Sequence, residues 1–258
     1  MKSLSKAMLL LMALFGLVGC EDKLEQKGFA VPSNMEEEEQ VDGISRDSMV
    51  FHTRPSNVLL TGHPRFRLTT VYKVNFKKDS TSFIGSNSFY SNYSNIGETD
   101  GNQWHYNYLP GMEAVYGYNM VNVSHFDKET QKQKLFFENP VLIKTLYYPS
   151  FSKDTLNNVP INRNYFMVSV YDEDTNKDGF INTNDLRRFY SFNIEADGKK
   201  PIVPTNFSVY KSEYDPANDF LFVFATLDKD GNGQIDKLEP SSIFWVDLKN
   251  PEKTGKQY

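Results

Sequence analysis

Residues 220–227 are Phe-Leu-Phe-Val-Phe-Ala-Thr-Leu, residues 228–239 are Asp-Lys-Asp-Gly-Asn-Gly-Gln-Ile-Asp-Lys-Leu-Glu, and residues 243–248 are Ile-Phe-Trp-Val-Asp-Leu. The apolar residues that alternate on either side predict two strands, each with one buried face. The Asp, Asn and Gly residues between them favour a tight connection. This stretch is therefore expected to form a strand, a polar loop and a second strand.

The same pattern occurs a second time, 54 residues earlier in the chain. This shift places Phe166–Val170 on Phe220–Phe224 and Phe189–Phe192 on Ile243–Val246 without a gap. Fainter copies around residues 63–72 and 118–137 would give four units. Repeats of this period are typical of blade or hairpin arrays. We predict a mainly β fold of repeated strand–loop–strand units in a propeller-like array, with a β-sandwich as the alternative.

The first twenty residues have the pattern of a secretory signal. Lys2 and Lys6 precede the uncharged run Ala7–Gly19, which is too short to span a bilayer as a helix. The run ends in Leu17-Val18-Gly19-Cys20, which resembles the lipobox of bacterial lipoproteins. The resemblance implies a signal peptide at residues 1–20 and a lipid anchor, with palmitate, on Cys20. Since Cys20 is the only cysteine, no disulfide can form within the chain.

Residues 21–42 are expected to be a disordered acidic tether. They contain eight acidic side chains, few apolar residues, and Lys23 and Lys27 as their only bases. Acidic residues directly after the cysteine resemble the export signal of Bacteroidota surface lipoproteins. This resemblance implies a lipid-anchored protein at the outer membrane or cell surface.

Residues 43–258 are expected to form the β-rich body. The formal net charge is −5 for the whole chain, +2 for the signal and −6 for the tether, which leaves a net charge of about −1 for the body. A nearly neutral body without a basic stripe argues against nucleic acid as a partner. The expected partners are the membrane, calcium, and an envelope protein or a glycan.

The two polar loops, residues 174–185 and 228–239, resemble the twelve-residue EF-hand calcium loop. Calcium requires six to eight oxygen ligands, and EF-hand loops supply them from positions 1, 3, 5, 7, 9 and 12, with glycine at position 6 for the turn. The resemblance implies two calcium sites. The implied ligands are Asp174, Asn176, Asp178, Phe180, Asn182 and Asp185 in loop one, and Asp228, Asp230, Asn232, Gln234, Asp236 and Glu239 in loop two.

Two features of the loops depart from ordinary EF hands. Strand patterns flank them where EF hands have helices, which is similar to the calcium hairpins of integrin-type propellers. Those hairpins close at position 9, so either position 9 or position 12 could close each site. Asp185 is also one methylene shorter than the usual glutamate, and Ile181 and Ile235 at position 8 are expected to anchor the loops inward.

No catalytic residue is predicted. The four histidines show no metal-ligand spacing, and no G-x-S-x-G motif is present. We therefore expect a non-enzymatic binding or scaffold role with structural calcium. A secreted glycoside hydrolase, or another hydrolase with structural calcium, is the alternative.

Overall fold

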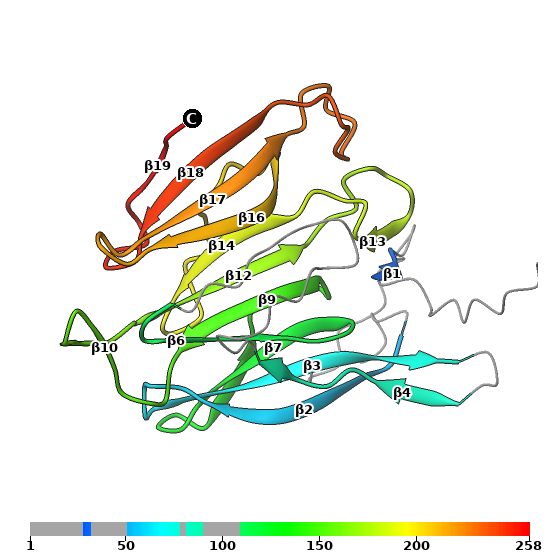
Figure 1. The fold of residues 1–258 in the computed structure, drawn as a ribbon. Helices are drawn as coiled ribbons and strands as arrows, with labels where there is room; N and C mark the ends of the chain where they lie inside the picture. Colours follow the sequence, from blue (N-terminus) through cyan, green and yellow to red (C-terminus); the bar gives the residue numbers. More distant parts are fainter. Residues whose placement is uncertain (1–27, 32–50, 78–80, 90–108) are drawn as a thin grey trace, which may run out of the picture.

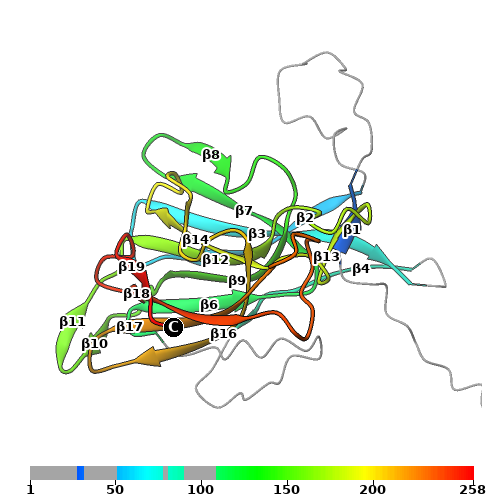
Figure 2. The ribbon, with the colours of Figure 1, turned by 90° about the horizontal axis from the view of Figure 1, so that it is seen from above.

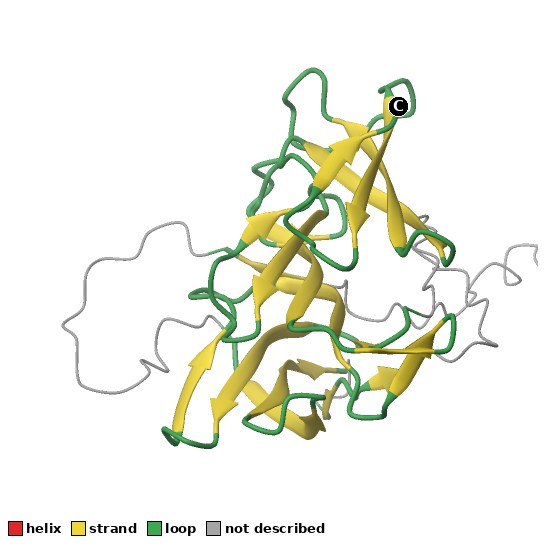
Figure 3. Cartoon of the chain, turned by 90° about the vertical axis from the view of Figure 1, so that its left-hand side faces the viewer, coloured by secondary structure: helices red, strands yellow, loops and turns green. Residues whose placement is uncertain are grey.

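The computed structural model describes residues 28–31, 51–77, 81–89 and 109–258. The predicted signal peptide, Cys20 and most of the predicted tether lie outside these residues. All regular structure in the described part is β, as the strands in Figure 3 show. The mainly β fold class is confirmed. None of the described segments is a helix of the length and apolarity needed to cross a membrane.

The larger of the two main sheets has eleven strands. Its central order is β15-β14-β12-β9-β7-β3-β2, and shorter strands pair with it at several points. Its members are β2 (Thr53–Leu60), β3 (Phe66–Phe76), β4 (Ser82–Ile84), β5 (Ser88–Phe89), β6 (Met112–Tyr116), β7 (Met120–Asp127), β8 (Lys132–Leu135), β9 (Leu142–Pro149), β12 (Tyr165–Tyr171), β14 (Arg188–Asn193) and β15 (Lys200–Pro201).

The second main sheet is a four-stranded antiparallel meander, which lies above β14 in Figure 1. It consists of β16 (Phe207–Asp215), β17 (Phe220–Leu227), β18 (Ser241–Asp247) and β19 (Thr254–Lys256). Two separate pairs complete the fold: β1 (Gly28–Ala30) with β13 (Phe180–Asn182), and β10 (Asp154–Leu156) with β11 (Val159–Ile161). The fold thus combines a four-stranded meander, the kind of sheet that forms a propeller blade, with one continuous eleven-stranded sheet.

The predicted repeat is visible in the structure as two equivalent hairpins. The first is β12, loop one and β14, and the second is β17, loop two and β18. The pairing of the second hairpin differs from the repeat by one residue, because Val170 faces Arg188 whereas Phe224 faces Ile243 rather than Ser242. The sequence repeat therefore fixes the elements but not their pairing register.

Two apolar cores lie on opposite faces of the larger sheet. Phe166 and Val168 of β12 enter one core together with residues of β3, β7 and β9. Met167 of β12 enters the other core, where Leu221 and Val223 of β17 meet it from the four-stranded sheet. Sheet-on-sheet packing through the second core is compatible with the sandwich alternative.

The predicted alternation holds where a strand has one solvent face. β3 alternates between buried and partly exposed residues along most of its length. β12 differs from the expected single buried face, because all seven of its residues are buried. The reason is that the four-stranded sheet covers the face that would otherwise meet water.

Candidate calcium site

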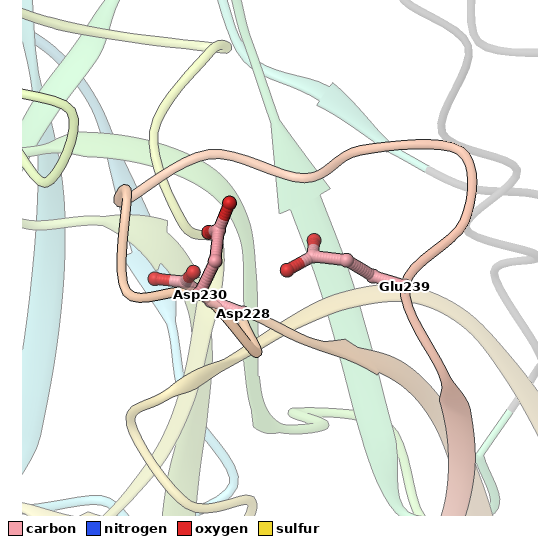
Figure 4. Close-up of side chains that lie close together, drawn as sticks. All are labelled: Asp228, Asp230 and Glu239. Atoms are coloured by element: carbon pink, nitrogen blue, oxygen red, sulfur yellow. The ribbon is translucent and has the colours of Figure 1, made fainter.

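Loop two gathers three carboxylates around one point. The facing oxygens of Asp228, Asp230 and Glu239 all lie within 4.8 Å of one another, and Figure 4 shows Glu239 reaching toward the two aspartates. Oxygens that bind one Ca²⁺ at about 2.3–2.6 Å are at most about 5 Å apart. The donor set and its spacing therefore fit calcium. Position 12, and not Asp236 at position 9, completes this group.

Backbone amides hold these carboxylates in place. Asp228 accepts hydrogen bonds from the amides of Gly231 and Gly233 at 2.8 and 3.0 Å. Glu239 accepts from the amides of Lys229 and Asp236 at 2.6 and 3.0 Å. Asp236 lies beside the side-chain amide of Asn232, 3.3 Å away. Position 1 thus tightens the turn, and position 12 ties the beginning of the loop to its end.

Loop one repeats this scheme at the same positions. Asp174 accepts hydrogen bonds from the amides of Asp178 and Gly179 at 3.1 and 2.9 Å. Asp185 accepts from the amides of Thr175 and Asn182, both at 2.8 Å. In both loops position 1 accepts from the amides of positions 5 and 6, because Asp228 also accepts from Asn232 at 3.1 Å, and position 12 accepts from those of positions 2 and 9. The resemblance between the loops therefore extends from sequence to geometry.

The turn conformation is also shared. Lys177 and Gly231 at position 4 have φ of 59° and 72°, and Gly179 and Gly233 at position 6 have φ of 86° and 81°. Such left-handed backbone favours glycine because a Cβ is crowded there. Position 6 is therefore glycine in both loops for a physical reason.

Loop one does not form a comparable acidic group. Among the described residues, the three side chains of loop two are the single group of three acidic, His or Cys side chains at this spacing. Asp185 is only 3% exposed, and burial raises the pKa of its carboxyl above the ordinary value, although backbone amides oppose that rise. The shorter Asp185 side chain is held by amides at the loop ends.

The remaining predicted ligands of loop one are partly or largely exposed to solvent. Asn176 and Asp178 are hydrogen-bonded to each other, 3.2 Å apart, and the side-chain amide of Asn182 is 3.4 Å from Asp178. The side chain of Phe180 is half exposed. In loop two, the side-chain oxygen of Asn232 accepts a hydrogen bond from the amide of Gln234.

The position-8 residues differ between the loops. Ile181 is buried, with 7% exposure, as expected, whereas Ile235 is 38% exposed, so its predicted inward anchoring is wrong. Ile181 lies in β13, which pairs with β1, and no strand of the described part pairs with residues 234–236. A covering strand, and not the loop itself, buries position 8.

The two loops touch each other. The hydroxyl of Thr175 in loop one donates to the backbone oxygen of Gly233 in loop two. This contact was not predicted, because nothing in either loop indicates which residue of the other lies next to it. The repeat showed only that both hairpins carry their loops at matching points.

Comparison with known proteins supports calcium-binding loops. The family model described as EF hand matches residues 174–190 and 223–239. No curated protein sequence matches the chain. One similar solved structure is a candidate TolB from Agrobacterium tumefaciens, with 6% identity, 81% of this chain and 82% of that chain covered, and a TM-score of 0.24. At that TM-score the likeness adds nothing to the fold assignment.

Proposed function

We propose that this chain is a calcium-binding lipoprotein of the bacterial cell envelope, with a non-enzymatic binding or scaffold role. The observation that carries the calcium part is the convergence of Asp228, Asp230 and Glu239 in a loop that matches the EF-hand family. Loop one supports a second, weaker site through the same pattern of amide hydrogen bonds. The lipobox that ends in Cys20 supports the envelope part.

Calcium in this proposal stabilises the body and does not switch it. Both loops connect paired antiparallel strands. The acidic groups at the bend of loop two repel one another without a cation. Both loops have strands at their boundaries, and the helix pairs that open in EF-hand sensors are absent from the described residues. The ion would be held by Asp228, Asp230 and Glu239, which it would draw together by neutralising their charge.

Removal of calcium is expected to lower the melting temperature by several degrees. Sites with a dissociation constant of about 0.1 mM in about 1 mM calcium add about 1.4 kcal/mol each to the free energy of unfolding. For a body of roughly 200 residues, two such sites correspond to a shift of several degrees. Thermal melting of residues 21–258 in calcium and in excess chelator measures it. An unchanged midpoint would contradict calcium binding, and a large change in the far-UV spectrum below the transition would contradict a purely stabilising role.

Loop two is expected to bind calcium more tightly than loop one. Loop two offers four carboxylates, including Asp236, whereas loop one offers three. One of the four, Glu239, can bind through both oxygens. More ligand charge and a bidentate ligand both raise calcium affinity. Calorimetric titration of Asp174→Ala and Asp228→Ala proteins separates the sites. Asp174→Ala should leave the tighter site and Asp228→Ala the weaker one. The reverse order would count against the proposed ligand sets.

Membrane attachment is expected to depend on Cys20. A Cys20→Ser protein should lose palmitate labelling and appear in the soluble fraction, because the proposed anchor is its lipid. The control is Ser5→Ala in the signal, which leaves the cysteine intact. Sedimentation of the Cys20→Ser protein with membranes after a high-salt wash would show that another feature holds the chain there.

A further inference from the structure

The N-terminal strand β1 packs directly against loop one. Its residues Gly28, Phe29 and Ala30 pair with positions 9, 8 and 7 of the loop, and the amide of Val31 donates to Gly179 at 2.8 Å. In Figures 1 and 2, β1 lies beside β13 and apart from the four-stranded sheet. A segment more than 140 residues away in sequence thus covers the outer edge of this loop.

Several further contacts hold β1 in this place. Phe29 is 8% exposed and packs with Ile181, Tyr171, Leu142 and Val121 in an apolar cluster of its own. The amide of Gly28 donates to Asn119 at 3.0 Å, and Lys73 donates to the carbonyl of Gly28 at 3.3 Å. A Cβ on Gly28 would lie 2.2 Å from the carbonyl oxygen of Ile181, so only glycine allows this approach.

The pairing fixes the part of loop one that a cation needs. Phe180 at position 7 supplies a backbone carbonyl in the proposed site, and successive carbonyls of a strand point to opposite sides. The carbonyl of Gly179 is directed to β1, so the next carbonyl, that of Phe180, points away from β1 and is left free of the strand pairing. Asn182, paired with Gly28, donates the amide that holds Asp185.

We infer that β1 is a positioning element of the first calcium site, so that calcium in loop one and docking of the N-terminal strand strengthen each other. The inference rests on the proposed function. Because linkage is reciprocal, a strand that orders loop one raises its calcium affinity, and calcium stabilises the docked strand by the same factor. Loop two has no covering strand in the described part, which makes it an internal reference.

The linkage has a consequence for the proposed lipoprotein. With β1 docked, seven residues separate Cys20 from the described body. An extended chain spans at most about 3.5 Å per residue, so docking of β1 would hold the body within about 25 Å of the proposed lipid anchor. Calcium would therefore keep the body close to the membrane.

The test uses hydrogen exchange and calorimetry on residues 21–258. In the parent protein, calcium should slow amide exchange in a peptide that contains residues 28–31, and Asp174→Ala should abolish that slowing. In an Asp228→Ala background, which leaves loop one to be titrated alone, Phe29→Ala should weaken calcium binding about tenfold. Gly28→Ala should do the same without removing an apolar side chain, because its methyl group blocks the pairing.

The control is Phe137→Ala, which removes a similarly buried ring from another core and should leave loop-one affinity unchanged while the protein is folded. Calcium binding to loop one with unaltered exchange at residues 28–31 and less than a twofold effect of Phe29→Ala would overturn this inference alone. If calcium gives no heat with the parent protein and no shift of its melting temperature, the proposed function is wrong as well.

Discussion

Replacement of Arg163 by alanine is expected to lower the free energy of unfolding by about 3–5 kcal/mol, the usual cost of breaking a buried ion pair from one side. Arg163 and Asp219 are 2% and 0% exposed, and their two hydrogen bonds are 2.9 and 2.8 Å long. Arg163 also donates to the carbonyls of Pro110 and Leu248. The substitution would leave the Asp219 charge buried without its partner.

The ion pair between Arg163 and Asp219 connects the two main sheets, so breaking it would weaken the contact between them. Arg163 precedes β12 in the larger sheet, whereas Asp219 lies in the turn between β16 and β17 of the smaller one. Tyr214 donates a hydrogen bond to Asp219 at 3.1 Å. In the Arg163→Ala protein this bond would compensate only part of the Asp219 charge. The pair therefore joins the two sheets at one end of the second core.

Urea unfolding of the single and double variants measures this effect. The double variant Arg163→Ala/Asp219→Ala should lose less than the sum of the single losses, because it leaves no charge unpaired. The matched control is Lys200→Ala, which removes an exposed pair with Glu252 and should cost no more than about 1 kcal/mol. A loss of similar size at Arg163 and at Lys200 would refute the structural role given to the buried pair.

Replacement of Gly233 by alanine is expected to cost about 2–5 kcal/mol. A left-handed backbone costs a residue with a Cβ about 1–2 kcal/mol, and overpacking adds about 1–3 kcal/mol. The added methyl group would lie 1.8 Å from the backbone oxygen of Thr175, so one of the two loops must move. The hydrogen bond from Thr175 to Gly233 would be lost with this shift.

Loop two offers its own control for this variant. Gly231 has a similar φ of 72°, but no atom lies within 4 Å of the position of its added Cβ. Gly231→Ala should therefore cost only the conformational part, about 1–2 kcal/mol. Unfolding in chelator separates stability from calcium binding. Equal losses for the two variants would mean that the loops do not press against each other in solution.

The sequence by itself determined the strands of the body, the repeat and the turns of both loops, but not β1, which lies in the segment expected to be a disordered tether. These features depend on short-range spacing: period-two alternation selects strands, and the Asp174 and Asp228 carboxylates bond amides only three to five residues further on. The left-handed backbone at position 6 favours glycine in both loops.

Only the tertiary structure decided how these elements are combined. It shifted the pairing of the second hairpin by one residue and buried both faces of β12. It placed β1 on loop one, whereas no strand among the described residues lies on loop two. It also joined Arg163 to Asp219, 56 residues apart. The physical reason is that an apolar residue needs burial and a buried charged residue needs a counter-charge. Neither residue specifies which distant segment will cover it or supply that charge.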